Sequence, residues 1–196
     1  QKNNQPLVSI IMNCYNGENF LHESIKSVLS QTYENWELIF WDNRSNDKSA
    51  EIFKSYDDKR FKYYYALKHT LLSEARNEAI KRSSGEFIAF LDIDDFWQKD
   101  KLELQVPFFK NSSVGVVYGN FFVINEKLNT KKIFLKRKKP KGFILDELLE
   151  NYCTTLVTLV IRKSFLDNYQ PAFDKSFHIM GDFDLIIRMS IKYQFD

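Results

Sequence analysis

Short runs rich in apolar and β-branched residues alternate with segments of helical periodicity, and this alternation most constrains the fold. Three runs have the length and composition of buried strands: Leu7 to Cys14, Trp36 to Trp41 and Phe87 to Leu91. Between and around them the sequence predicts a helix carrying Leu21, Ile25, Val28 and Leu29, a helix from about Lys48 to Tyr56, a strand at Phe61 to Tyr65, and a helix carrying Leu72, Ala75, Ala79 and Ile80. Strands joined by helices form a parallel sheet that is covered on both faces, so the predicted class is α/β.

The regularity loosens beyond Trp97. Val114 to Val123 and Lys131 to Leu135 predict paired strands joined across residues 125–129, and Leu156 to Ile161 predicts one more buried strand. A last helix, from about Gly181 to Tyr193, is apolar on nearly every face and is expected to be buried. No linker divides the chain, so we expect one domain over residues 1–196. Because the sequence stops directly after this helical pattern, we expect a C-terminally truncated piece of a longer protein.

Three carboxylates follow the apolar strand at Phe87 to Leu91, namely Asp92, Asp94 and Asp95. In an open parallel sheet, ligands bind beyond the carboxyl ends of the strands, so this cluster is expected at the mouth of a site. Crowded carboxylates repel one another unless a cation lies between them, and their hard oxygens suit Mg²⁺ or Mn²⁺. A divalent metal in turn implies a phosphate-bearing partner. The alternative is an acidic strand exit that caps the next helix.

A phosphate site in this chain has to work without a glycine-rich loop. The sequence has only six glycines and neither a dinucleotide fingerprint nor a Walker loop. Phosphate charge must then be neutralised by a metal on Asp92 and Asp94 or by lysines and arginines. The loops Cys14 to Glu18 and Asp42 to Ser45 also follow strands, so they open at the same edge as the aspartates. The sequence therefore predicts a site built from three strand-end loops.

The charge of the chain limits its partners. A net charge of +2 and a pI near 8.4 are too mild to indicate nucleic acid. The basic run Lys136 to Lys141 is interpreted as a solvated loop or, alternatively, as a peripheral contact with an anionic membrane. Cys14 and Cys153 lie far apart, which predicts buried thiols in a reducing compartment. Because every apolar run is too short to span a bilayer, the expected location is cytoplasmic, with the inner face of the membrane within reach.

Two stretches together resemble a known family. The segments VSIIMNCYNGENFLHESIKSVLSQTYENWELIFWDNRSND and SEARNEAIKRSSGEFIAFLDIDD resemble the nucleotide-sugar glycosyltransferases of the GT-A fold, family 2, closely over about Leu7 to Asp95. The resemblance implies a Rossmann-like, mostly parallel sheet flanked by helices, with a smaller acceptor-side region. It assigns about residues 7–97 to the nucleotide sugar and 98–196 to the acceptor. The implied activity is metal-dependent, inverting transfer of a sugar from a nucleoside diphosphate to a hydroxyl acceptor, in polysaccharide or glycoconjugate biosynthesis.

The resemblance also implies roles for single residues. Tyr15 and Asn16 would lie against the nucleotide, and the turn Asp42-Asn43 would face its base. Asp92 would lie near the ribose, and Asp94 would bind the Mn²⁺ or Mg²⁺ that holds the diphosphate. Asn43 stands where the family usually has an aspartate that accepts the N3 proton of a uracil-like base. An amide oxygen can accept that bond without charge, so a UDP or dTDP donor is favoured, with a saccharide or lipid-linked acceptor.

The catalytic base of the family is a carboxylate at the head of a late helix, often in the sequence Glu-Asp. Here Asp182 matches the aspartate, while Gly181 replaces the glutamate. A base is needed because an acceptor hydroxyl has a pKa far above neutrality, so a carboxylate must take its proton during attack. The alternative for Asp182 is a helix cap that contributes about 0.5–2 kcal/mol. His178 is a weaker candidate for the acceptor site.

Two rival functions remain open. The departure at Gly181 leaves room for a catalytically silent nucleotide-sugar-binding module. A sugar-phosphate nucleotidyltransferase would share the α/β layout and the metal, but it would need a glycine-rich, basic first loop. Arg76 is expected to be a structural ion-pair partner, and Trp97 is placed where it could stack on a sugar.

Overall fold

The structure is a computed structural model that describes residues 5–125, 127–177 and 179–196. Its first half runs β1 (Val8–Cys14), α1 (Leu21–Leu29), β2 (Trp36–Asp42), α2 (Ser49–Lys54), β3 (Phe61–Tyr65), α3 (Leu72–Lys81) and β4 (Phe87–Phe90). Its second half runs α4 (Lys101–Gln105), the 3-10 helix η2 (Val106–Lys110), β5 (Val114–Val117), β6 (Phe122–Asn125), β7 (Thr130–Ile133), α5 (Leu145–Glu150), the 3-10 helix η3 (Leu156–Thr158), β8 (Val160–Arg162), α6 (Lys163–Leu166), α7 (Gly181–Ser190) and β9 (Gln194–Phe195).

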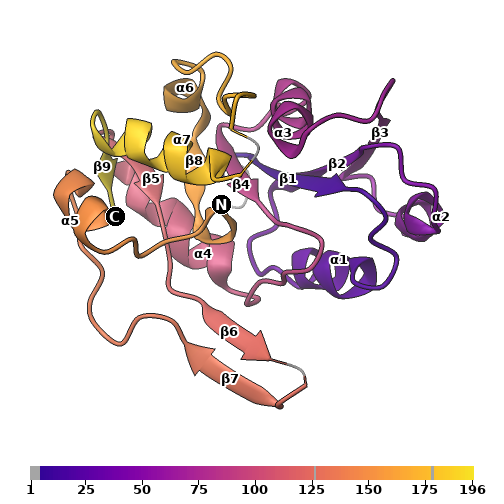
Figure 1. The fold of residues 1–196 in the computed structure, drawn as a ribbon, viewed down its shortest axis with the longest axis horizontal. Helices are drawn as coiled ribbons and strands as arrows, with labels where there is room; N and C mark the ends of the chain where they lie inside the picture. The colour runs from indigo at the N-terminus through magenta and orange to yellow at the C-terminus, as the bar shows by residue number, and fades with distance from the viewer. Residues whose placement is uncertain (1–4, 126, 178) are drawn as a thin grey trace.

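Seven strands form one sheet in the order β3-β2-β1-β4-β8-β5-β9 (Figure 1). Strands β1 to β4 are mutually parallel, β9 is parallel to β5, and β8 runs antiparallel to both of its neighbours. The mostly parallel α/β sheet predicted from the sequence is therefore confirmed. The chain moves outward from β1 through β2 to β3 and then returns to place β4 on the other side of β1. This reversal creates a topological switch point between β1 and β4.

Both faces of the sheet are covered, as the uncharged strands predict. On β1, Ile11 joins one core cluster, while Ile10 and Met12 join the other, because neighbouring side chains point to opposite faces. The cluster around Ile11 includes residues of α3, α5, α6 and α7, and the cluster around Ile10 includes residues of α1, α2, α4 and η2. The result is a three-layer sandwich. In the part of the chain that the structure describes, no helix has the length and apolar character needed to cross a membrane.

The second half differs from its sequence-based prediction in three places. Val114 to Val123 is not one strand: β5 ends at Val117 and joins the central sheet, and only β6 pairs with β7. Leu156–Thr158 forms a 3-10 turn, closed by Thr158 Oγ1 donating to the Thr155 carbonyl, so the strand begins only at Val160. The last helix ends at Ser190, because the chain turns there and adds Gln194–Phe195 to the sheet beside β5.

Candidate functional site

The candidate site lies beyond the carboxyl ends of β1, β2 and β4. Cys14, the last residue of β1, is in register with Asp42, the last residue of β2, and the Leu91 amide beyond β4 donates to the Ile11 carbonyl of β1. The loops that follow these strands therefore emerge side by side at the switch point. They carry Tyr15, Asn16, Asp42, Asn43, Asp92 and Asp94. The structure thus brings together six of the seven site residues predicted from the sequence, and Asp182 comes from α7.

The loops after β1 and β2 are tied to each other by their polar groups. Asn16, in a left-handed conformation with φ 54°, accepts the Asn46 amide on its side-chain oxygen, and its own amide donates to Ser45 Oγ. Gly17 donates to Ser49 Oγ. A Cβ atom on Gly17 would meet Ile93 Cδ1 at 2.3 Å, so the glycine allows the loops after β1 and β4 to approach closely. Hydrogen bonds within the protein therefore fix the positions of the loops after β1 and β2.

Asp42 and Asn43 are buried and engaged within the protein. The Asp42 carboxylate accepts the Ser45 amide at 2.7 Å and the Tyr63 hydroxyl at 2.7 Å. Asn43 Nδ2 donates to the Thr70 carbonyl at 2.8 Å, while Oδ1 accepts the Thr70 amide at 3.1 Å and its hydroxyl at 3.2 Å. These bonds make the two side chains supports of the turn and of the loop before α3.

Sequence reasoning missed His69, which lies at the same edge of the sheet. Its Nδ1 is 2.9 Å from the Asn43 carbonyl oxygen, an atom that can only accept, so Nδ1 carries a proton and donates this bond. The rings of His69 and Tyr15 lie 4.3 Å apart at a tilt of 54°, and Tyr15 is half exposed. Its place after β3, in the loop that precedes α3, was the one available signal.

The three aspartates after β4 differ in their environment. Asp92 accepts two hydrogen bonds from Arg76 Nη2, at 2.9 and 3.1 Å, as expected for a structural partner. Asp94 is exposed, and none of the described residues donates to its carboxylate. Partial burial of the carboxyl group, and then repulsion by Asp92 and Asp94, raises the pKa of Asp95 to about 6. Among the residues described, no group of three His, Cys, Asp or Glu side chains could hold a metal by itself.

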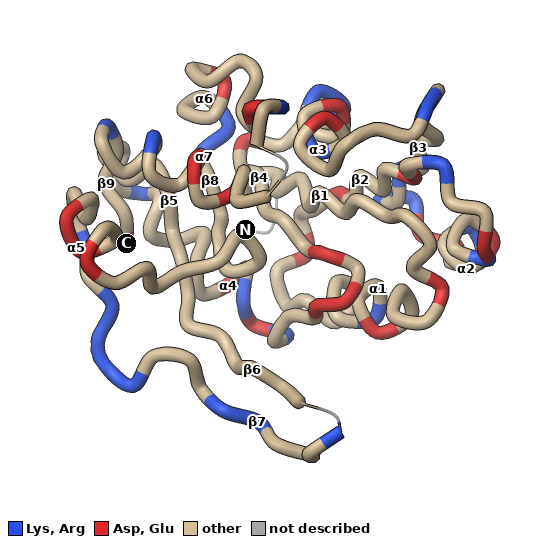
Figure 2. The backbone as a smooth tube through the Cα atoms, in the orientation of Figure 1, with Lys and Arg blue, Asp and Glu red and all other residues tan. Residues whose placement is uncertain are grey.

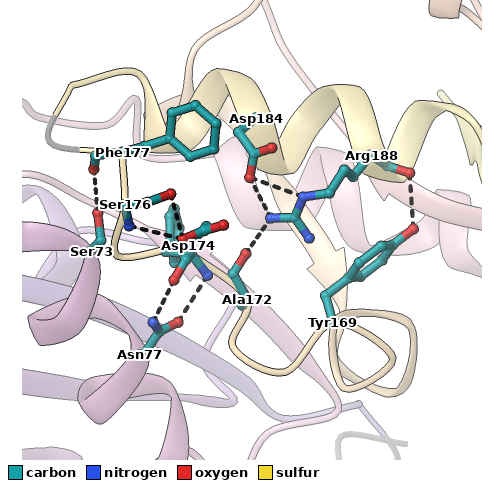
Figure 3. Close-up of polar contacts among 10 residues, drawn as sticks. Ser73, Asn77, Tyr169, Ala172, Asp174, Ser176, Phe177, Asp184 and Arg188 are labelled. Carbon is teal, nitrogen blue, oxygen red and sulfur yellow. Dashed lines mark hydrogen bonds and ion pairs between the residues drawn. The ribbon is translucent and has the colours of Figure 1, made fainter.

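Helix α3 connects this acidic loop to the segment that leads into α7. Arg76 on α3 holds Asp92, and the neighbouring Asn77 exchanges two hydrogen bonds with the backbone of Phe173, at 2.7 and 2.9 Å. One turn earlier, Ser73 Oγ donates to the Phe177 carbonyl (Figure 3). The Ala-Arg-Asn segment therefore fixes both the aspartates and the approach to Asp182.

Asp182 lies in the first turn of α7 and is partly exposed. The capping position is Met180, with φ 65°, and among the described residues no side chain caps this helix end, so Asp182 is not the N-cap. Its place in the first turn still puts its charge where the helix dipole favours an acidic group. Burial, and then the negative charge of Asp182, raises the pKa of Tyr152, which places that hydroxyl near the carboxylate. Asp184, by contrast, is paired with Arg188 at 2.6 Å (Figure 3).

Gly181 occupies a confined position. The residue is buried, and a Cβ atom there would lie 3.3 Å from Ser73 Oγ and 3.8 Å from Phe173 Cδ1. A contact of 3.3 Å is tighter than nine in ten Cβ contacts, so a larger residue at position 181 would require Ser73 to shift by a few tenths of an ångström. Glycine at this position leaves the contact between α3 and the start of α7 undisturbed. His178 lies outside the described residues.

A cavity of about 960 Å³ opens beside the acidic loop. Its walls come from the Asp94-Asp95 loop, α4, the β6–β7 hairpin and the basic segment, with the lysines Lys101, Lys127, Lys131, Lys138, Lys139 and Lys141 in its lining. Burial of its ammonium group lowers the pKa of Lys101 to about 7. Trp97 is almost fully buried and donates to the Val157 carbonyl, so its indole is packed in the wall and does not offer an open face to a sugar.

Sequence comparison identifies the family of this chain. The family model for glycosyl transferase family 2 matches residues 9–186. The chain belongs to this family. It is 37% identical over 167 residues to the Escherichia coli UDP-Glc:alpha-D-GlcNAc-diphosphoundecaprenol beta-1,3-glucosyltransferase WfgD, covering 85% of this chain and 64% of the relative. It is 32% identical over 159 residues to the putative teichuronic acid biosynthesis glycosyltransferase TuaG of Bacillus subtilis, covering 80% and 62%. The chain thus spans less than two thirds of these relatives.

Solved glycosyltransferases share the fold. The structure matches Staphylococcus aureus TarS in complex with UDP-GlcNAc with a TM-score of 0.77 and 20% identity, covering 96% of this chain and 58% of that one. It matches the mannosyltransferase PcManGT of Pyrobaculum calidifontis, in complex with GDP-Man and Mn²⁺, with a TM-score of 0.71 and 16% identity, covering 100% and 55%. The GT-A fold expected from the resemblance is confirmed.

Proposed function

We propose that this protein is an inverting, metal-dependent glycosyltransferase that moves a sugar from a nucleoside diphosphate to a hydroxyl acceptor. One observation carries the proposal: Asp94 presents an exposed carboxylate, with no partner among the described residues, at the β1–β4 switch point, next to Asp92, which Arg76 holds in place. A free carboxylate among repelling neighbours fits a divalent cation.

The donor would lie across the strand-end loops. Tyr15 and Asn16 are exposed there, and Tyr15 with His69 provides an aromatic surface on which a base can stack. We favour UDP or dTDP as the nucleotide, and the structural neighbour TarS is known with UDP-GlcNAc. Asp42 and Asn43 would shape the base pocket through the turn and Thr70, and Asp92 would adjoin the ribose. In this proposal residues 7–97 bind the donor.

Asp94 would be the protein's ligand to Mn²⁺ or Mg²⁺, which supplies neutralisation of the diphosphate leaving group when bound. The residues present fit such an ion, because three carboxylates within four positions generate a negative potential that a cation relieves. Since no three protein ligands are grouped among the described residues, donor oxygens and water would complete the coordination. Arg76 keeps Asp92 oriented while the site fills.

Asp182 would be the general base. Its carboxylate is partly exposed at the start of α7 and carries no ion pair among the described residues, whereas Asp184 is tied to Arg188. The acceptor oxygen loses its proton to Asp182 as it attacks the anomeric carbon from the face opposite the diphosphate. The new glycosidic bond forms as the bond to the diphosphate breaks, so the anomeric configuration inverts. Asp182 then releases the proton to solvent.

The acceptor half, residues 98–196, would use the large cavity beside Asp94. Its lysines and aromatic side chains suit a saccharide carried on an anionic, lipid-linked diphosphate. The printed name of the relative WfgD specifies a diphosphoundecaprenol acceptor, which supports this choice and a role in polysaccharide assembly. We infer a cytoplasmic protein that reaches the inner face of the membrane through Lys136 to Lys141.

A thermal-shift panel tests the proposal. Nucleoside diphosphates and nucleotide sugars are added with and without Mn²⁺, because a ligand that binds the native state raises the unfolding midpoint. We expect the largest shift from a uridine or thymidine donor with Mn²⁺, and release of free sugar from that donor without acceptor. Binding without donor hydrolysis or transfer would identify a silent module. Formation of a nucleotide sugar from a sugar phosphate and a nucleoside triphosphate would identify a nucleotidyltransferase.

A further inference from the structure

The β6–β7 hairpin stands apart from the rest of the fold. It forms a separate two-stranded sheet, and each of the eight residues in its strands is exposed. Figure 1 shows the hairpin projecting from the body of the protein below α4. A two-stranded ribbon in water is marginally stable by itself, so an exposed ribbon rich in apolar side chains indicates a surface that something covers.

The two faces of the hairpin look in different directions. Phe122, Ile124 and Lys131 line the cavity beside Asp94, and this defines the inner face. Because side chains alternate along a strand, Val123 and Lys132, which are paired across the ribbon, lie on the outer face together with Asn125 and Thr130. Val123 is 53% exposed, and Leu128 at the turn is 70% exposed. Phe134, just after β7, is 45% exposed and stacks on Phe121. The outer face therefore presents one exposed valine among polar and basic side chains, and Leu128 and Phe134 add apolar surface at the two ends of β7.

The same region is strongly basic, whereas the whole chain has a net charge of only +2. Residues 119–145 contain eight lysines and arginines and a single acidic residue, Glu126. Figure 2 shows these cations along β7 and along the segment that leads from it to α5. Lys132, Lys136 and Arg137 are exposed and do not belong to the cavity lining. The region thus combines cations with apolar side chains on one projecting element.

We propose that the outer face of the β6–β7 hairpin, with the basic segment after it, docks on an anionic lipid bilayer. Apolar insertion or charge attraction alone gives weak membrane binding, and stable attachment takes both signals. The hairpin supplies Val123, Leu128 and Phe134 for the interface, and Lys132, Lys136 and Arg137 face the headgroups. Charge complementarity selects this occupant, because a second copy docked hairpin to hairpin would bring two groups of cations together.

Docking in this way places the cavity against the bilayer, since the inner face of the same ribbon is a cavity wall. A lipid-linked acceptor could then remain in the membrane while its head group enters the cavity. This consequence rests on the proposed function, whereas the docking itself rests only on the exposed apolar and basic side chains.

Vesicle flotation tests the docking with two kinds of vesicle, phosphatidylcholine alone and phosphatidylcholine mixed with phosphatidylglycerol. The protein is expected to float with the mixed vesicles and not with the neutral ones. The apolar variant Val123→Ser/Leu128→Ser and the charge variant Lys132→Gln/Lys136→Gln/Arg137→Gln should each bind the mixed vesicles at least about tenfold more weakly. Matched controls are Leu67→Ser, at a residue 98% exposed elsewhere, and Lys59→Gln/Lys175→Gln. Both should bind as the unmodified protein does.

The proposal is overturned if the protein ignores the mixed vesicles, if it binds both vesicles equally, or if either hairpin variant binds normally. Circular dichroism and Mn²⁺-dependent UDP binding establish that each variant is folded. If a hairpin variant binds vesicles normally but has a different oligomeric state in light scattering, the face binds a second copy of the protein and the membrane proposal is wrong. Loss of vesicle binding with UDP binding retained supports docking, and vesicle binding by a protein that never binds UDP would refute only the proposed function.

Discussion

Asn43 and Thr70 are joined by three hydrogen bonds. The Asn43 side-chain amide donates to the Thr70 carbonyl and accepts from the Thr70 amide, as two paired strand residues do, and it also accepts from the Thr70 hydroxyl. Asn43 is 5% exposed, so water has little access to these hydrogen bonds. The carboxylate that the family usually has at this position would accept the two bonds from Thr70 but could not donate to its carbonyl. In this protein the amide therefore has a structural reason of its own.

Replacing Asn43 with Asp should destabilise the fold. The substitution removes one donor and sets a carboxylate oxygen against the Thr70 carbonyl, and leaving a buried group unsatisfied costs about 1–3 kcal/mol. Urea unfolding measures the change, with Asn46→Asp at an exposed site of the same loop as the control. If Asn43→Asp were as stable as the unmodified protein and bound UDP more tightly, the amide would be dispensable and the family's carboxylate arrangement would be favoured.

Asp94→Asn tests the metal site. The amide keeps the size of the side chain but loses the charge that draws a divalent cation, so Mn²⁺-dependent UDP binding should weaken by at least about tenfold. UDP binding measured in chelator should change little, because the stacking surface at Tyr15 is intact. Isothermal titration measures both, and Asp57→Asn, at an exposed residue remote from the strand ends, is the control. Unchanged Mn²⁺-dependent binding would remove Asp94 from the metal site.

Asp182→Asn separates chemistry from binding. The fold and the nucleotide-induced thermal shift should persist, while transfer falls by about 10²–10⁴ because the acceptor proton has no base to accept it. Asp184→Asn is the matched control in the same helical turn. It breaks the pairing with Arg188, which also donates to the Ala172 carbonyl, so it should lower stability and retain turnover per folded molecule. Native transfer rates in Asp182→Asn would leave Asp182 without a catalytic role.

The lowered pKa of Lys101 should make the stability of the protein depend on pH. Its pKa is lowered by burial to about 7 from an ordinary value of 10.5, so between these two values the unfolded chain binds more protons than the native one. The free energy of unfolding should therefore rise with pH across this window, by up to about 1.4 kcal/mol per pH unit from this group. Lys101→Met should remove that slope and raise stability most at and below pH 7. Parallel slopes for both proteins in urea titrations at several pH values would contradict the lowered pKa.

The first half of the fold could be predicted because its signals are local. Largely apolar strands such as Trp36 to Trp41 and polar loops at their ends determine the sheet and place the candidate residues at one edge. The second half could not, because its strands depend on distant partners. Val114–Val117 pairs with β8 and with a two-residue strand eighty residues later, and nothing in the local sequence distinguishes it from Phe122–Asn125, which remains outside the main sheet.

The site was predicted in its residue types and less well in its contacts. That Arg76 pairs with an acidic group was foreseen, but that its partner is Asp92 follows only from the return of β4 beside β1. The coupling of Asn43 to Thr70 and of His69 to the Asn43 carbonyl joins loops about 27 residues apart. Such bonds depend on which loops lie close together in the folded protein, and this cannot be predicted from a single sequence.

Helix α3 connects the acidic loop after β4 to the segment that precedes α7. Arg76 binds Asp92 in the acidic loop, while Ser73 and Asn77 bind the backbone of the segment that leads to Asp182. All three residues lie within five positions of one helix. In the proposed reaction, these contacts help to set the distance between the donor-binding loop and Asp182. None of the three comes from the β6–β7 hairpin or from the basic segment after it, so exchanging those two elements for a new acceptor would leave the contacts of α3 intact.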